Sequence, residues 1–211
     1  LAVERFISSE EVFEQDLRNA IEKKEFEMYL QPQYNVIDKR ICGCEMLIRW
    51  NNPKYYHQSP AKFIELAERN NLIIPLAKFI NEESMRIAKL LEPYNIELSL
   101  NVSPVQILQA GFVNELVEMA KKYEVNPNLI ALEITETFLM ENFTAVNGKL
   151  KLLQGYGFKI HLDDFCTGYS SMLYLKELPI NSIKIDKEFT RFLNTDSYSR
   201  AIVNKLAALA N

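Results

Sequence analysis

Short apolar runs alternate with helical patterns along most of this chain, and this alternation limits the folds open to it. Extended runs are expected at about 96–101, 129–134, 158–163 and 181–185, and helical patterns at about 109–122, 143–154, 170–176 and 198–210. Strands that alternate with helices in this way form a parallel sheet covered by helices. The steps from Asn101 to Glu133 and from Glu133 to Asp163 are close to the roughly 30 residues that one β/α unit occupies in a closed eight-stranded barrel. The sequence therefore predicts an α/β fold of the barrel type.

The start of the chain has a different pattern. Ser8 and Glu11 form a capping box in front of an apolar helical face, which predicts a helix at about 9–24. We interpret residues 1–25 as a helical connection to an upstream domain and residues 26–211 as the main domain.

Before the regular alternation, the chain predicts a hairpin followed by two helices. Alternating apolar positions with a turn at Asp38-Lys39 predict the two hairpin strands, at about 26–36 and 40–49. Ser59-Pro60 is an N-cap and first-turn pair that predicts the start of one helix, and the next helix is expected at about 76–91.

Composition excludes several classes of protein. A chain of 211 residues with 48% hydrophobic content fits one large globular domain. A net charge of −4 gives no general attraction to a nucleic-acid polymer. No apolar run approaches the roughly 20 residues that cross a bilayer. The three cysteines have no CxxC spacing, which argues against a disulfide framework or a structural zinc site. We expect a cytoplasmic domain, in a parent protein that could be membrane-anchored.

Polar residues that can bind metal or phosphate stand at or beside the ends of the apolar runs. They are Glu45, Asn101, Glu133, the adjacent pair Asp163-Asp164, and Lys184. Because the C-terminal strand ends of such a barrel ring one face, these side chains are expected to converge. Carboxylate and amide oxygens suit Mg²⁺ or Mn²⁺, and two such ions can activate a water for phosphoryl displacement. The lysine is expected to orient that water or to offset phosphate charge.

Taken singly, each of these residues has a simpler explanation. An acidic residue after a strand is commonly a helix cap or a loop carboxylate, and a lone strand-end lysine is more often solvated. His57 and His161 are expected to serve packing or surface roles and are left out of the site. The joint pattern, and not any one residue, indicates a shared site.

The motifs resemble the EAL family of cyclic-di-GMP phosphodiesterases, from about Phe26 to the end of the chain. In family order they are Gln31-Pro32, Glu45-Met46-Leu47 with Ile48-Arg49-Trp50, Asn101-Val102-Ser103, Glu133-Ile134-Thr135-Glu136, the stretch from Asp163 to Ser171, and Lys184-Ile185-Asp186. The resemblance implies a modified TIM (β/α)₈ barrel that hydrolyses cyclic di-GMP to linear pGpG with two divalent ions, Mg²⁺ or Mn²⁺. It also implies bacterial signalling, a homodimer, and an upstream sensor or diguanylate cyclase-like domain.

The resemblance assigns roles to single residues. The implied metal ligands are Glu45, Asn101, Glu133, Asp163, Asp164 and Asp186. Lys184 would orient the nucleophilic water, with Glu45, Asp163 and Asp164 as the other catalytic groups. Gln31 and Arg49 would contact the dinucleotide, and the planar fork of an arginine suits phosphate because it donates paired hydrogen bonds. Glu136 would brace the loop after Asp164.

The sequence departs from the family pattern in three places. Met46 replaces the usual alanine but points away from the face of Glu45, so it is expected to alter packing and not ligation. Cys166 replaces the usual glycine of a loop that couples metal to dimerisation, which narrows the backbone conformations available there. Six extended segments are two fewer than a closed barrel needs, so we expect the last two strands to be missing from this chain, with a further glutamate and a glutamine of the family.

Three functions stay open on the sequence. The first is the phosphodiesterase, favoured for the complete parent domain. The second is a noncatalytic EAL module that binds cyclic di-GMP or a protein partner. The third is a barrel glycosidase, although Lys184, Asn101 and the aspartate pair exceed what its two carboxylates require. We also expect Lys184 to serve catalysis and not folding, so that replacing it should leave the melting temperature nearly unchanged.

Overall fold

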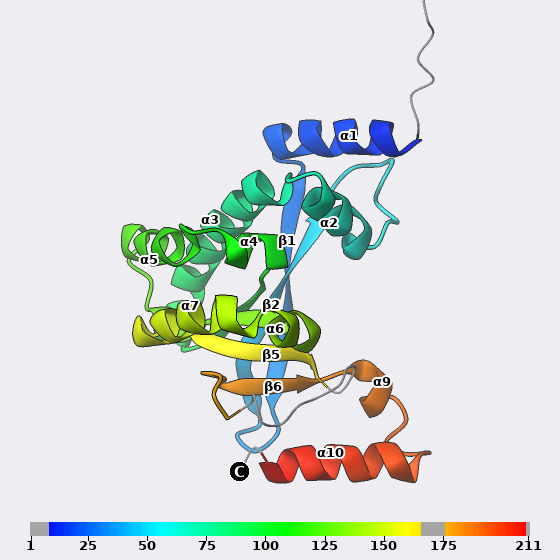
Figure 1. Ribbon diagram of the computed structural model, residues 1–211, viewed down its shortest axis with the longest axis vertical. Coiled ribbons are helices and arrows are strands. Elements are labelled where there is room, and N and C mark those ends of the chain that lie inside the picture. The colour runs from blue at the N-terminus through cyan, green and yellow to red at the C-terminus, as the bar shows by residue number, and fades with distance from the viewer. Residues whose placement is uncertain (1–8, 166–175, 210–211) are drawn as a thin grey trace, which may run out of the picture.

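The computed structural model describes residues 9–165 and 176–209, and within them one six-stranded sheet organises the molecule (Figure 1). The strands lie in chain order: β1 (Phe26–Asn35), β2 (Arg40–Trp50), β3 (Glu97–Asn101), β4 (Ile130–Thr135), β5 (Lys159–Phe165) and β6 (Ser182–Ile185). β1 pairs antiparallel with β2, and all later neighbours pair in parallel. The predicted hairpin and parallel sheet are confirmed.

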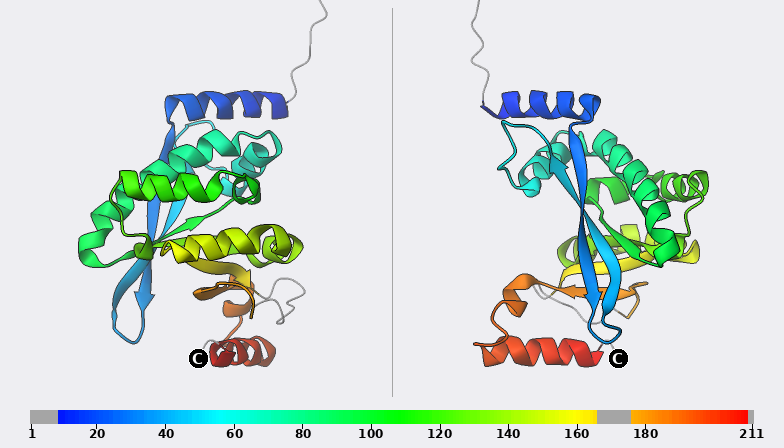
Figure 2. Two further views of the ribbon diagram at one scale, coloured as in Figure 1. Left: turned by 60° about the vertical axis from the view of Figure 1, so that its left-hand side comes forward. Right: turned by 180° about the vertical axis from the view of Figure 1, so that it is seen from behind.

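The described helices precede β1, lie in the connections from β2 to β5, and follow β6. They are α1 (Ser9–Lys23), α2 (Pro60–Arg69), α3 (Ile73–Leu91), α4 (Pro104–Leu108), α5 (Phe112–Lys122), α6 (Glu136–Glu141), α7 (Phe143–Gly155), α9 (Lys187–Thr190) and α10 (Ser197–Leu209), with short 3₁₀ turns at Glu92–Tyr94 and Pro127–Leu129. None of these helices has the length and apolar character needed to cross a bilayer. Figure 2 shows α3, α5 and α7 stacked beside the strands, while the β1–β2 hairpin runs out past them.

Two helix predictions differ from the structure. The helix predicted over 109–122 is two helices, because Gln109 adopts an extended ψ of 138° and ends α4 before Gly111 opens α5. α3 begins at Ile73 and not at 76, since Pro75 is accommodated in its first turn. Ser8 and the helix predicted at 170–176, except for Lys176, lie outside the described ranges.

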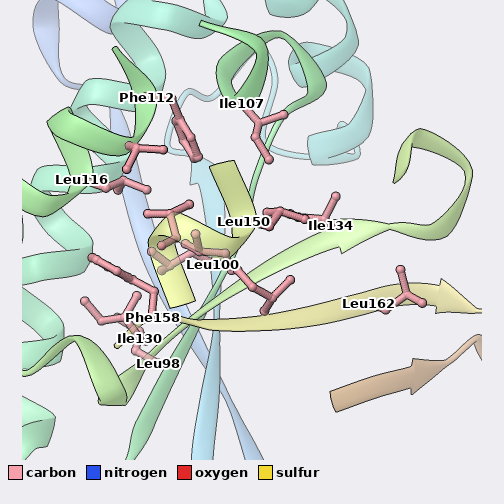
Figure 3. Close-up of a cluster of buried hydrophobic side chains, with 14 of the residues drawn as sticks. Leu98, Leu100, Ile107, Phe112, Leu116, Ile130, Ile134, Leu150, Phe158 and Leu162 are labelled. Carbon is pink, nitrogen blue, oxygen red and sulfur yellow. The ribbon is translucent and has the colours of Figure 1, made fainter. Parts of the chain in front are cut away.

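The outer face of the sheet carries the main core. Alternate strand residues point to it, and the set includes Leu98, Leu100, Ile130, Ile134 and Leu162, packed with Ile107, Phe112, Leu116, Leu150 and Phe158 from the helices and loops (Figure 3). All ten are at most 2% exposed. Because strand side chains alternate, this apolar face leaves the opposite, inner face to the polar residues of the same strands.

A second core joins α1 to the rest of the domain. Trp50, at the end of β2, stacks on Phe13 of α1 and on Tyr55, with ring centroids 5.7 and 4.5 Å apart. Asp16 of α1 accepts hydrogen bonds from the Tyr55 hydroxyl at 2.5 Å and the Lys54 ammonium at 2.7 Å. The first helix is therefore packed on the body of the domain. Its interpretation as a connection to an upstream domain stays a prediction.

Candidate active site

The ammonium group of Lys184, on β6, lies among carboxylates from three other strands. Its Nζ is 2.9 Å from Glu45 Oε2 on β2, 2.6 Å from Glu133 Oε2 on β4 and 3.8 Å from Asp163 Oδ1 on β5. Asn101, on β3, donates a hydrogen bond from Nδ2 to Glu45 Oε1 at 3.1 Å. Five of the six residues that the sequence placed at or beside strand ends thus lie close together.

Strand register explains this convergence. Glu45 stands opposite Ser99, and Asn101 stands opposite Glu133, in the parallel ladders that join β2 to β3 and β3 to β4. Side chains at matched positions of neighbouring strands share a face, so these polar groups gather on the inner one. Met46, one residue on, is 4% exposed within the outer core, which confirms that it points away from Glu45.

Glu133 is the most deeply buried carboxylate of the group, with a side chain that is 0% exposed. Burial raises the pKa of Glu133, against the opposing effect of hydrogen bonds from Lys184 and the Ser99 hydroxyl. Among the described residues, its Oε1 has no hydrogen-bond partner. A buried carboxylate oxygen of this kind is under-satisfied unless a ligand reaches it.

Lys184 is stabilised as the charged form. Burial lowers the pKa of Lys184, but the hydrogen bonds that its ammonium donates to Glu133 and Glu45, together with the negative charges of Glu133 and Asp163, outweigh burial and raise the pKa overall. The site therefore contains one ammonium shared by carboxylates, instead of a lysine free to lose its proton.

A bulge in β5 separates the two adjacent aspartates. The pairing with β6 shifts between Leu162 and Phe165, and Asp164 adopts a φ of 51°, a left-handed conformation that aspartate tolerates better than most residues. Burial raises the pKa of Asp164, with further contributions from Asp163 and Asp186. Asp163 thus faces Lys184, whereas Asp164 lies beside Asp186, which also caps α9 by accepting from the Glu188 N–H at 2.6 Å.

The two predicted substrate contacts lie at different heights on the hairpin: Gln31 in the middle of β1 and Arg49 next to the open end, one pair from Phe26–Trp50. Gln31 is exposed and pairs with Glu45 in the β1–β2 register. The guanidinium of Arg49 lies 5.6 Å from the centre of the Tyr29 ring and lines a pocket of about 240 Å³ with Tyr56. Two larger cavities, of about 740 and 750 Å³, lie between α1 and α2 and between α3 and α5, away from the carboxylates.

Glu136 and the histidines complete the set of sequence predictions. Glu136 is 1% exposed at the first residue of α6, but the loop that it is predicted to brace begins at Cys166 and lies outside the described residues. His161 is buried, with Nε2 3.3 Å from Glu97 Oε1, and its pKa is lowered by burial. His161 lies two residues before Asp163 on β5 and is buried, which agrees with the expected packing role.

Sequence reasoning missed Ser99. Its side chain is fully buried two residues before Asn101, close enough to Glu133 to lower the pKa of that carboxyl, and its Oγ accepts a hydrogen bond from Gln33 Nε2 at 3.4 Å. The signal was present, since residues i and i−2 of a strand share a face. Ser99 lies inside β3 and not at its end, so a pattern of polar strand ends does not include it.

Known proteins share this fold. A family model described as the EAL domain matches residues 14–211. The chain belongs to the EAL domain family. A solved structure titled PaMucR phosphodiesterase, in complex with c-di-GMP, matches with a TM-score of 0.88 and 33% identity, covering 94% of this chain and 81% of that one. The EAL enzyme Bd1971 matches with a TM-score of 0.87 and 32% identity, covering 95% and 56%. The six strands are therefore part of a modified TIM barrel.

Curated relatives are longer than this EAL domain. MucR of Pseudomonas aeruginosa, named a bifunctional diguanylate cyclase/cyclic di-GMP phosphodiesterase, is 34% identical over 92% of this chain and 29% of its own length. PdeG of Escherichia coli, named a probable cyclic di-GMP phosphodiesterase, is 34% identical over 99% and 42%. The chain spans between 25% and 32% of the length of four curated relatives that it matches.

The donors around Lys184 fit a hard divalent ion in their chemistry. Carboxylate and amide oxygens are the ligands that Mg²⁺ and Mn²⁺ take, and the Oε1 atom of Glu133 is buried without a protein partner in the described part of the chain. Over residues 9–165 and 176–209, however, no three acidic, histidine or cysteine side chains are arranged to hold a metal together. The ammonium of Lys184 stands between the donors instead.

Proposed function

We propose that this EAL domain hydrolyses one phosphodiester bond of cyclic di-GMP to give linear pGpG, with Mg²⁺ or Mn²⁺ as the cofactor. The convergence of Glu45, Glu133 and Asp163 on Lys184 carries the proposal, because acid, amide and amine groups from five strands meet where a barrel holds its chemistry. The activities for which MucR and PdeG are named, and the c-di-GMP complex of PaMucR, support it.

Each residue has a distinct role in the proposed reaction. Glu45, Asn101, Glu133 and Asp163 would hold one ion, and Asp164 beside Asp186 would help to hold the other. The ions would lower the pKa of a bound water and neutralise phosphate charge.

The protein's own groups bind and orient the substrate. Arg49 and Gln31 would grip the dinucleotide from the hairpin side of the site, where the Tyr29 ring steadies the guanidinium at 5.6 Å. Lys184 would hold the attacking water in line and donate to the phosphate. The buried wall behind Glu133 keeps bulk water from that side of the reacting bond.

The proposal extends to location and assembly. The free thiols of Cys42 and Cys44 suit a reducing cytoplasm. The length of the relatives suggests that the parent protein has further domains, such as an upstream sensor or diguanylate cyclase-like domain. We also propose that the domain acts as a homodimer, which sedimentation of the full-length parent would test.

A product assay tests the activity. The 211-residue chain and its full-length parent would be incubated with cyclic di-GMP and Mg²⁺ or Mn²⁺, and pGpG measured by chromatography. We expect pGpG only when metal is present, and a loss of about 10²-fold or more in Glu45→Gln, which removes a charged ligand. Glu118→Gln, on an exposed face of α5, is the matched control and should not change turnover. Binding of cyclic di-GMP without hydrolysis by the parent would instead identify a noncatalytic module.

A further inference from the structure

Lys184 uses the same oxygen atoms that a divalent ion would need. Its Nζ contacts Oε2 of both Glu45 and Glu133, at 2.9 and 2.6 Å, and lies 3.8 Å from Oδ1 of Asp163. Glu45 Oε1 is also occupied, by the Asn101 amide at 3.1 Å. Of the carboxylate oxygens on Glu45 and Glu133, only Glu133 Oε1 has no partner in the described part of the chain.

The ammonium of Lys184 offsets negative charge in the site without a metal ion. One ammonium offsets a carboxylate whose side chain is fully buried and two others that are about one-fifth exposed. Without a cation at this point the buried carboxylate would be unpaired, which is costly in a protein interior. The lysine thus supplies inside the protein the positive charge that a metal ion would bring from solvent.

An ion and the ammonium cannot both occupy this place. A divalent ion bound by these carboxylates would stand within a few ångströms of the ammonium, and like charges at that distance repel strongly where water is scarce. The lysine, by contrast, can move. Its side chain is 26% exposed and attached through four flexible methylenes, whereas Glu133 is held in the sheet interior.

We propose that Lys184 is a built-in competitor for the divalent ion: its ammonium holds Glu45 and Glu133 together in the metal-free protein and leaves them when the ion binds. The inference rests on the metal binding in the proposed function and goes beyond it. Metal binding is thereby coupled to release of the amine. Lys184 becomes available to water and phosphate only after the cation has replaced it among the carboxylates.

Metal affinity measures this competition directly, without reference to turnover. Mn²⁺ binding to the 211-residue chain would be followed at pH 8 by calorimetry and by the electron paramagnetic resonance of free Mn²⁺. Lys184→Met keeps much of the side-chain length and removes the charge, and we expect it to bind the first Mn²⁺ about tenfold more tightly or better. Lys184→Gln, which keeps hydrogen-bond donors, should show the same direction.

Two control variants separate competition from a general loss of positive charge. Lys187→Met removes an exposed lysine three residues away and should change the dissociation constant by less than about twofold. Lys159→Met removes a lysine on the inner face whose Nζ lies 2.6 Å from Glu97 Oε2. Its effect on the Mn²⁺ dissociation constant should be much smaller than the effect of Lys184→Met. Unchanged or weaker Mn²⁺ binding in both Lys184 variants would overturn the proposal.

The wild-type chain offers a second measurement that needs no substitution. Acetic anhydride labels amines that are unpaired and reachable, and mass spectrometry reports each lysine separately. Saturating Mn²⁺ should speed acetylation of Lys184 several-fold and leave that of Lys187 unchanged. A Lys184 rate that does not respond to bound Mn²⁺ refutes displacement even if hydrolysis of cyclic di-GMP is observed. A wild-type chain that binds no Mn²⁺ removes both this inference and the proposed function.

Discussion

Replacing Lys184 by methionine should destabilise the metal-free protein substantially. The change leaves the carboxylate of Glu133 fully buried without its counter-ion, with one oxygen already lacking a partner in the described residues. Breaking a buried ion pair costs about 3–5 kcal/mol. The lysine side chain is 26% exposed, so part of its charge is solvated and we take about 2–4 kcal/mol. For a chain of this size that corresponds to a fall in Tm of about 4–16 °C. The structure thus changes the sequence-based expectation of a nearly unchanged melting temperature.

The loss of stability caused by Lys184→Met should depend on pH in a defined direction. The pKa of Glu133 is already raised by burial, and losing Lys184 raises it further, so the folded variant takes up a proton that the unfolded chain releases. The variant therefore regains stability as pH falls from 8 toward the unfolded value of about 4.5. In the wild type, the raised pKa of Lys184 gives stability that is fully present below 10.5 and lost as pH rises through the folded value. The difference in unfolding free energy between wild type and Lys184→Met is therefore largest at neutral to mildly alkaline pH.

Urea unfolding followed by circular dichroism measures this gap. Wild type, Lys184→Met and the exposed control Lys187→Met would be compared in EDTA at pH 5, 6, 7 and 8. The control should match the wild type throughout. A difference below about 0.5 kcal/mol at every pH would show that Glu133 does not depend on the ammonium, and the pairing seen here would then have no energetic consequence.

Three further substitutions test other parts of the structure. Trp50→Phe keeps most ring packing but loses the indole hydrogen bond to Glu25 Oε2 at 3.2 Å, so urea unfolding should show a cost of about 1 kcal/mol. Arg49→Met should weaken cyclic di-GMP binding about tenfold or more with little change in Tm, measured by titration; an unchanged affinity would remove it from the substrate site. Hydrogen bonds, first that of Lys54 and then that of Tyr55, lower the pKa of Asp16 in the folded protein. The stability that they contribute is lost as pH falls through the pKa of Asp16 in the folded state. Asp16→Asn should therefore lose less stability in acid than the wild type does.

The regular strands were predictable because their side chains alternate. The runs expected at 129–134 and 158–163 begin within a residue of β4 and β5, since buried branched residues repeat at every second position. Short helices were not predictable in the same way. α6 begins at Glu136 directly after β4 and has six residues, too few for a helical period to show.

The membership of the site was predictable, but its internal pairing was not. Equivalent strand ends of a parallel sheet meet, so Glu45, Asn101 and Glu133 could be grouped without coordinates. Which oxygen each group contacts depends on rotamers and on the exact depth of β6. The bond from Lys184 to Glu45 spans 139 positions of the chain, and no local pattern specifies it.

The sequence-based prediction assigned Lys184 to catalysis and not to folding. In the structure its ammonium contacts the carboxylates of Glu45 and Glu133, so the same group can serve both roles. A site that gathers carboxylates for metal is unfavourable for the metal-free fold, because burial raises the free energy of each charge. The side chain of Glu133 is 0% exposed to bulk solvent, so its negative charge needs a counter-ion from the chain or from a bound ion. Lys184 meets that need from the strand beside Asp163, within reach of the reacting groups. Under the proposed competition, removing the charge of Lys184 should therefore lower the stability of the metal-free protein and raise its affinity for the metal ion.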